Sequence, residues 1–242
     1  MLWHNIQKNP CRVEGGTIKA DEIISKLKSL KSPKDVEGMA RFGINPSKTF
    51  GIRIPVLRKM AKEIGKNHRI ALELWDSGYH EARILASMVD DYKQVSEAQM
   101  EKWVSELDSW DVCDSCVMNL FEDVEIAWDK AVEWSKKRQE FVKRAGFVMM
   151  ARLAVSNKKA PDEYFIKFFP IIKSEADNEA NLVKKAISWA LRQIGKRNLN
   201  LNQKAVEVAR EILERESKGA KWIAKDALKE LTSGPVQKRI SP

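Results

Sequence analysis

The feature that most constrains this chain is an apolar pattern of helical period that runs nearly from one end to the other. Apolar residues recur at spacings of three and four, and no segment shows the sustained alternation expected of a half-buried strand. Short polar breaks such as Asp76-Ser77-Gly78 separate helices expected to be about 11 to 17 residues long. This pattern predicts an all-α fold of antiparallel helix pairs with brief connections.

Local signals place several helix ends. Ser32-Pro33 combines an N-cap residue with proline in the first turn, and Ile54-Pro55 should open a helix that closes near Gly65. Ser96 is expected to cap a helix that reaches Leu107, and Pro161 to open a further helix.

Weak internal repetition adds to this picture. Ala145, Ala186 and Ala227 recur at intervals of 41 residues, in the range of HEAT or armadillo units. We therefore expect a superhelical stack of HEAT-like helical repeats, an α-α solenoid with a curved binding surface. The expected organisation is a flexible N-terminal extension over residues 1–18, a single repeat domain over 19–234 and a C-terminal tail over 235–242.

Charge is segregated along the chain. Residues 1–69 carry nine more basic than acidic side chains, residues 70–130 eleven more acidic ones, and residues 131–242 eleven more basic ones. Solvated helix faces would explain many of these lysines individually, but they explain the segregation less well. The layout favours a polyanionic partner.

Several classes of protein and site are disfavoured. No apolar run approaches the length of a membrane span, and the first 16 residues lack the core of a secretory signal, so a cytoplasmic protein is expected. Cys113 and Cys116 match half of a zinc or redox motif, yet the histidines supply no suitably spaced second pair of ligands. We expect both thiols to pack within a helix, and we expect neither a metal nor a cofactor.

The stretch from Glu179 to Gly195 is expected to be an amphipathic helix. Its buried stripe is formed by Val183, Ala186, Ile187, Ala190, Leu191 and Ile194. Lys185, Ser188, Trp189 and Arg192 should lie on the opposite side. Another helix could cover Trp189, but an indole between cations also suits contact with a nucleotide.

Two further helices carry candidate polar residues. Within residues 109–121, Trp110 and Asp114 are four residues apart at the margin of an apolar stripe, where a carboxylate could be functional or could simply pair with a basic neighbour. Within residues 140–154, Arg144 interrupts an apolar row and needs an anion, either phosphate or a carboxylate such as Asp114. The other tryptophans considered are assigned to packing, namely Trp75, Trp103, Trp128, Trp134 and Trp222.

Taken in order, several motifs across residues 35–230 resemble the AlkD-like DNA alkylation repair family. They are residues 50–58 (FGIRIPVLR), residues 72–75 (LELW), residues 81–83 (EAR), the pair Trp110 and Asp114, and residues 185–192 (KAISWALR). The resemblance implies a HEAT-like repeat fold and a DNA glycosylase that removes N3- or N7-alkylated purines, without metal or cofactor. We expect its partner to be double-stranded DNA that carries alkylated bases, and we expect a monomer associated with DNA.

The resemblance also implies roles for individual residues. Asp114 would be the catalytic carboxylate, and Trp110 and Trp189 the aromatic walls around the lesioned nucleotide. Arg144 would contact the DNA backbone, with Lys185 and Arg192 as supporting cations. Phe42 stands where the family commonly has a tyrosine, and it would lie near the lesion without that hydroxyl.

These residue types suit the chemistry. An alkylated purine is cationic and already a good leaving group, so a fixed carboxylate can stabilise the oxocarbenium-like sugar of the transition state. Two alternatives remain open at this point. One is a non-catalytic scaffold for damaged, distorted or branched DNA, which the missing hydroxyl at Phe42 favours. The other is a protein–protein adaptor that docks through the acidic block at residues 70–130.

Overall fold

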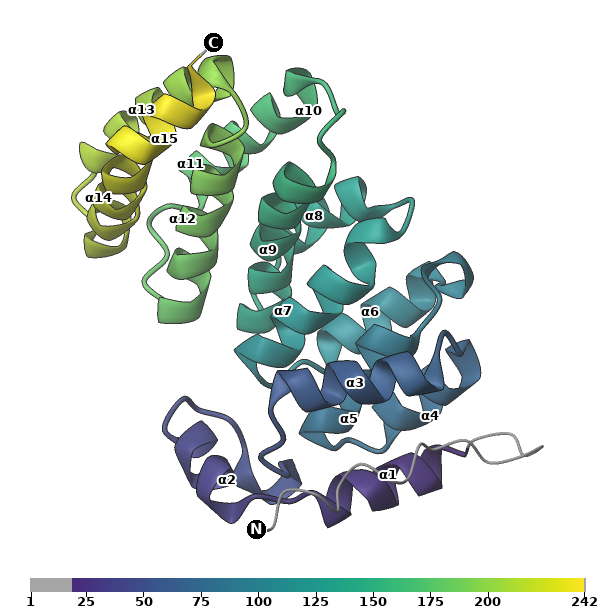
Figure 1. Ribbon diagram of the computed structural model, residues 1–242. Coiled ribbons are helices and arrows are strands. Elements are labelled where there is room, and N and C mark those ends of the chain that lie inside the picture. Colours follow the sequence, from purple (N-terminus) through teal and green to yellow (C-terminus); the bar gives the residue numbers. More distant parts are fainter. Residues whose placement is uncertain (1–18, 242) are drawn as a thin grey trace. The chain divides into compact units, whose positions relative to one another are not determined.

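The computed structural model describes residues 19–241, so the extension expected over residues 1–18 lies outside the described residues. Residues 19–241 form α-helices and short 3-10 turns and contain no strand, which confirms the all-α prediction (Figure 1). In this part of the chain, no helix is both long enough and apolar enough to cross a membrane. The chain divides after Val95 into two compact units, and each is described by itself.

The first unit contains five α-helices within the described residues. Their bounds are α1 (Ala20–Ser29), α2 (Pro33–Ala40), α3 (Ile54–Ile64), α4 (His68–Asp76) and α5 (His80–Val89), with 3-10 turns at Pro46–Lys48 and Tyr92–Gln94. The expected signals act as proposed: the Ser32 hydroxyl accepts from the Asp35 amide at the start of α2, and α3 ends before Gly65, which has a φ of 74°.

A buried carboxylate organises the loop before α3. Glu81, on α5, is fully buried and accepts hydrogen bonds from the amides of Phe50, Gly51 and Ile52 at 2.6–3.1 Å. Gly51 has a φ of 78°, a conformation that side chains rarely adopt. Backbone amides that no strand or helix satisfies are thus paired inside the unit. This contact joins two of the motifs in the family resemblance and gives both a structural reason.

The second unit contains two rows of packed helices. It comprises α6 (Glu97–Ser105), α7 (Trp110–Asn119), a 3-10 turn (Phe121–Asp123), α8 (Ala127–Ser135), α9 (Glu140–Ser156), α10 (Asp162–Ile166), α11 (Phe168–Ser174), α12 (Asn181–Gly195), α13 (Leu199–Leu213), α14 (Lys218–Leu231) and α15 (Gly234–Ile240). In one row α7 packs on α9, α9 on α12, and α12 on α14 (Figure 1). The helices α8, α11 and α13 pack behind this row, as expected of helix pairs that bury a face against each neighbour.

Close helix contacts explain two glycines in this row. A Cβ atom at Gly146 of α9 would collide with the backbone of Trp134 and Ser135 of α8. A Cβ atom at Gly195 would press on Leu231 at 2.6 Å and on Ala205 at 2.8 Å. Glycine therefore sets the distance between neighbouring helices at both points.

Part of the acidic block is used inside this unit. Lys130 of α8 is buried, and its Nζ lies 2.6–2.7 Å from the carboxylates of Glu97, Glu101 and Glu133. Burial alone would lower the pKa of Lys130, but the hydrogen bonds that its ammonium donates to these carboxylates raise that pKa. The cluster ties α6 to α8, so Glu97 and Glu101 of the acidic block, with Glu133 beyond it, contribute to the fold.

The end of the chain forms a further helix. α15 covers most of the stretch expected as a tail, and its Val236 and Ile240 side chains are buried. The Gln237 amide donates to Asn202 Oδ1 at 3.1 Å and to the Leu231 carbonyl at 2.6 Å. These contacts hold α15 against α13 and the end of α14.

Candidate functional site

The central feature of the candidate site is an ion pair between α7 and α9. Arg144 donates from Nε to Asp114 Oδ1 at 2.9 Å and from Nη2 to Oδ2 at 2.8 Å. Its Nη1 donates to the Leu182 carbonyl of α12 at 2.7 Å. The two side chains keep only 8% and 17% of their surface exposed, for Arg144 and Asp114 respectively. One guanidinium therefore joins three helices that are far apart in sequence.

Asp114 is the anion that the interrupted apolar row of α9 required. Burial raises the pKa of Asp114, and the Arg144 guanidinium opposes that effect through its charge and its hydrogen bonds. All three hydrogen bonds of Arg144 are made within the protein. Contact between Arg144 and a DNA phosphate remains a prediction, whereas its positioning of Asp114 is observed.

The two tryptophans lie on the helices that flank α9. Trp110 begins α7, one turn before Asp114, and is half-buried. Trp189 of α12 is also half-buried, and it lies seven residues after Leu182 and therefore on the same helix face. When the Gln193 amide is oriented to satisfy its neighbours, its oxygen accepts from Trp189 Nε1 at 2.9 Å. This bond fixes one edge of the indole and leaves part of the ring accessible.

The cations of α12 divide into two environments. Lys185 is exposed. Arg192 binds Glu230 and lies 3.3 Å from Asp226, so its charge is balanced by α14. The prediction for Ser188 was wrong: it is fully buried and donates to Asp226 at 2.5 Å, because α14 covers the side of α12 that the sequence pattern left exposed.

Phe42 lies in the first unit, just after α2, and is 71% exposed. Its predicted contact with a lesion remains a prediction. The prediction for Cys113 and Cys116 is confirmed, since both are buried within α7. Burial, with a contribution from Asp114, raises the pKa of the Cys113 thiol, which keeps it protonated and unreactive. Within residues 19–241, no three histidine, cysteine or acidic side chains are grouped to hold a metal.

The assignment of Trp222 to packing was wrong. Trp75, Trp103 and Trp134 are buried, but Trp222 on α14 is 37% exposed, with Lys184 Nζ 5.6 Å from its ring centre. A pattern in the sequence could have distinguished Trp222 from the buried tryptophans. The spacing of a lysine, a tryptophan and two more cations in residues 185–196 recurs in residues 218–229.

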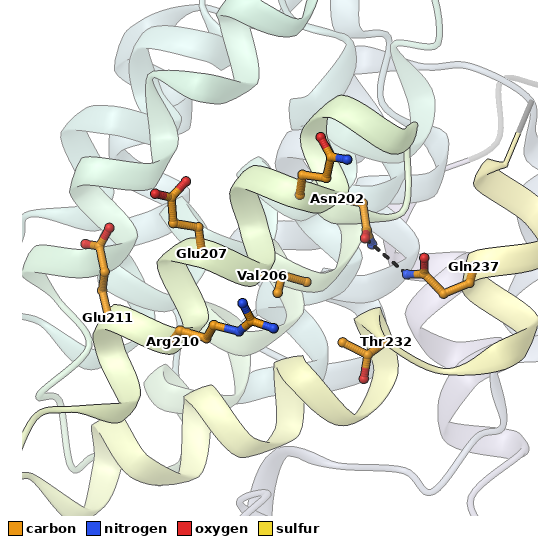
Figure 2. Close-up of a pocket in the computed structure, with 8 residues that line it drawn as sticks. Asn202, Val206, Glu207, Arg210, Glu211, Thr232 and Gln237 are labelled. Atoms are coloured by element: carbon orange, nitrogen blue, oxygen red, sulfur yellow. Dashed lines mark hydrogen bonds between the residues drawn. The ribbon is translucent and has the colours of Figure 1, made fainter.

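Two hollows lie elsewhere in the second unit. The first, of about 450 Å³, lies at the C-terminal ends of α9 and α12 and is lined by Lys158, Lys196, Arg197 and Arg239 among others. Arg197 donates to four backbone carbonyls there and Arg239 to one, so these cations first neutralise helix ends. The second, of about 750 Å³, lies along α13 and has mixed charge, with Glu207, Arg210 and Glu211 among its lining residues (Figure 2).

Comparison with known proteins agrees with this architecture. The model of a family described as DNA alkylation repair enzyme matches residues 23–231. This chain belongs to that family. One relative is the uncharacterized protein Lin0241 of Listeria innocua serovar 6a. The two sequences are 21% identical over 199 residues, which cover 81% of this chain and 87% of that protein.

A solved structure has a similar fold. It comes from proteins described as a new family related to the HEAT-like repeat DNA glycosylases with affinity for branched DNA structures. The match has a TM-score of 0.73 and 20% identity and covers 86% of this chain and 94% of that chain. The predicted HEAT-like repeat fold of this DNA alkylation repair family member is thereby confirmed.

Proposed function

We propose that this protein is a DNA repair glycosylase that removes cationic N3- or N7-alkylpurines, with Asp114 as its catalytic carboxylate. The observation that carries the proposal is the Asp114–Arg144 pair, held at the junction of α7, α9 and α12. Two of these helices also carry the half-buried indoles of Trp110 and Trp189. The membership of the chain in the DNA alkylation repair enzyme family supports the same reaction.

The proposed reaction is a hydrolysis. The bond from C1′ of the deoxyribose to N9 of the purine breaks, and its electron pair neutralises the positive charge of the base. Water adds its oxygen to C1′ and loses a proton to solvent, which leaves the free alkylated base and an abasic sugar. Positive charge accumulates at C1′ and O4′ in the transition state, so a fixed carboxylate beside the sugar lowers the barrier.

In this proposal, Arg144 is a positioning residue. Its two bonds to the Asp114 carboxylate fix the plane of that group, and its bond to Leu182 anchors the pair. Indole faces attract a cationic purine or sugar by cation–π and apolar contact, worth about 0.5–2 kcal/mol each. Lys185, exposed on α12, suits a phosphate of the DNA backbone and would position DNA without reading its sequence.

A base-release assay tests the proposal. Duplex DNA that contains N7-methylguanine should release the methylated base faster with the protein than spontaneously. Asp114→Asn keeps the size of the side chain and removes its charge, and we expect it to reduce release to the spontaneous rate. Asp111→Asn, one turn earlier on α7, removes a carboxylate from the same helix and should retain activity. Equal rates for the wild-type protein and Asp114→Asn would remove Asp114 from the mechanism.

A second candidate function is binding of branched or distorted DNA without chemistry. Both oxygens of Asp114 accept bonds from Arg144, so the carboxylate charge is largely balanced within the protein. The solved relative is described as having affinity for branched DNA. Binding to a four-way junction without release of N7-methylguanine would support this candidate over the glycosylase.

A further inference from the structure

One face of α14 combines an exposed aromatic ring with exposed cations. Lys218, Trp222, Lys225 and Lys229 are all exposed, and they follow one another at intervals of four, three and four residues. This spacing places them on a single helix face, hereafter the α14 stripe. An exposed tryptophan in the middle of three lysines is unusual for a solvated surface, because tryptophan is mostly buried in proteins.

The charge of the α14 stripe is not balanced by the other charged residues of its own helix. Asp226 faces α12, where it binds Ser188 and Arg192. Glu230 also faces α12, where it binds Arg192 and Lys196. Both acids of α14 are therefore paired with cations of α12. Near the stripe, Glu179 accepts from Ser217 and from the Gly219 amide at the start of α14 and offsets part of the charge of Lys218.

The Trp222 ring is held in place and is only partly covered. Lys184 of α12 lies over it, with Nζ 5.6 Å from the ring centre, and 37% of the residue remains exposed. A cation–π contact of this kind restricts the orientation of the indole. The ring therefore offers a flat apolar surface beside lysine side chains.

We infer that the α14 stripe binds an unpaired DNA strand, with Trp222 stacked on a base and the three lysines against phosphates. The inference rests on the proposed binding of DNA. Every base has a flat face, but a paired base hides it within the duplex, so an exposed indole selects unpaired nucleotides. Lysines act on phosphates as point charges and require no particular sequence.

Length and position agree with this occupant. Lys218 and Lys229 are 11 residues apart, which is about 16 Å along a helix, or about five nucleotides of one strand at 3.4 Å each. α14 is the last helix in the row α7, α9, α12 and α14. The α14 stripe therefore lies on the helix that ends this row.

Fluorescence anisotropy with two labelled DNAs tests the inference. One is a blunt duplex, and the other is the same duplex with an unpaired thymidine tail of about five nucleotides, matched to the length of the stripe. The wild-type protein should bind the tailed duplex more tightly. Trp222→Ala should weaken binding of the tailed duplex by about tenfold, the scale of one lost stacking contact, and leave the blunt duplex unchanged. Trp222→Phe keeps an aromatic face and should retain most of the preference.

The role of the lysines is tested separately by the salt dependence of binding. Neutralising all three (K218Q, K225Q and K229Q together) should reduce the slope of log affinity against log salt by about 2 for the tailed duplex, since each phosphate contact on a single strand contributes about 0.7. The matched control removes three exposed cations of the same unit outside the α14 stripe (K136Q, K159Q and R210Q together). It loses the same charge and should change the slope far less.

Three results would overturn the inference. In the first, Trp222→Ala binds the tailed duplex as tightly as the wild-type protein does. In the second, both triple variants reduce the slope of log affinity against log salt by the same amount, which would show that total charge and not the α14 stripe determines the salt dependence. Displacement of the tailed DNA by polyglutamate at equal charge concentration would instead assign the surface to an acidic protein. If the wild-type protein bound neither DNA, the proposed function itself would fail; if it released N7-methylguanine while the α14 variants bound normally, only this inference would fail.

Discussion

Removal of either partner of the Asp114–Arg144 pair is expected to destabilise the second unit strongly. Asp114→Ala would leave a guanidinium with only 8% of its side chain exposed and a single remaining acceptor, the Leu182 carbonyl. Loss of one member of a buried pair costs about 3–5 kcal/mol, chiefly because the other charge stays buried. Since Asp114 keeps 17% of its side chain exposed, we expect a value near the lower end, about 3 kcal/mol.

The double variant separates this effect from simple loss of contacts. Asp114→Ala combined with Arg144→Met leaves no uncompensated charge, and replacement of both partners by apolar groups is often close to neutral. We therefore expect the double variant to be more stable than Asp114→Ala alone. The pairwise coupling energy should be about 2 kcal/mol or more, within the range known for residues that share one network.

Urea unfolding followed by far-ultraviolet circular dichroism measures these differences in the free energy of unfolding, and thermal melts followed by the same signal check them. For a unit of this size, about 3 kcal/mol corresponds to a fall of about 6–12 °C in the melting temperature. Single variants that each cost less than about 1 kcal/mol, or costs that simply add in the double variant, would refute the reasoning. The base-release assay on Asp114→Asn should be run well below the melting temperature of that variant, so that unfolding is not mistaken for lost catalysis.

Three further predictions concern the fold. Glu81→Ala should destabilise the first unit by about 3 kcal/mol or more, because it leaves three buried amides without their acceptor; proteolysis of that unit measures the loss, and an unchanged cleavage rate would contradict it. Gly146→Ala should lower stability by about 1–3 kcal/mol through overpacking, whereas Gly38→Ala, where a Cβ meets nothing within 4 Å, should raise it in thermal melts. The third prediction concerns Glu230. Burial alone would raise the pKa of this carboxyl group, but hydrogen bonds from Lys196 and Arg192 lower the pKa of Glu230 below its ordinary 4.5. The stabilising contribution of Glu230 should therefore be present above pH 4.5 and be lost as pH falls through the lowered pKa. Glu230→Gln should make the urea midpoint of unfolding depend less on pH in this acidic range.

Local chemistry made the helices predictable. Capping by Ser32, the proline after Ile54 and the positive φ of Gly65 act within a few residues, so the sequence shows them directly. The buried stripe of α12 was correct for the same reason, because helical periodicity alone places those side chains on one face.

The surroundings of each helix were harder to predict. Ser188 was expected to be exposed because nothing within α12 shows that Asp226, 38 residues later, binds it from α14. Trp222 was assigned to packing because its pattern does not reveal which of its faces a neighbouring helix covers. Arg144 lies between these cases: its position in an apolar row required an anion, but only the packing of α7 on α9 identified Asp114 as that anion.

The contact between Glu81 and the loop at residues 50–52 has a consequence for the family. One carboxylate takes the place of an entire hydrogen-bonding partner strand for three successive peptide groups. A relative that replaced Glu81 with an apolar residue would have to redirect its main chain over the corresponding loop. The two segments are 30 residues apart, yet we expect them to have changed together during divergence, so that their substitutions are correlated across related genomes.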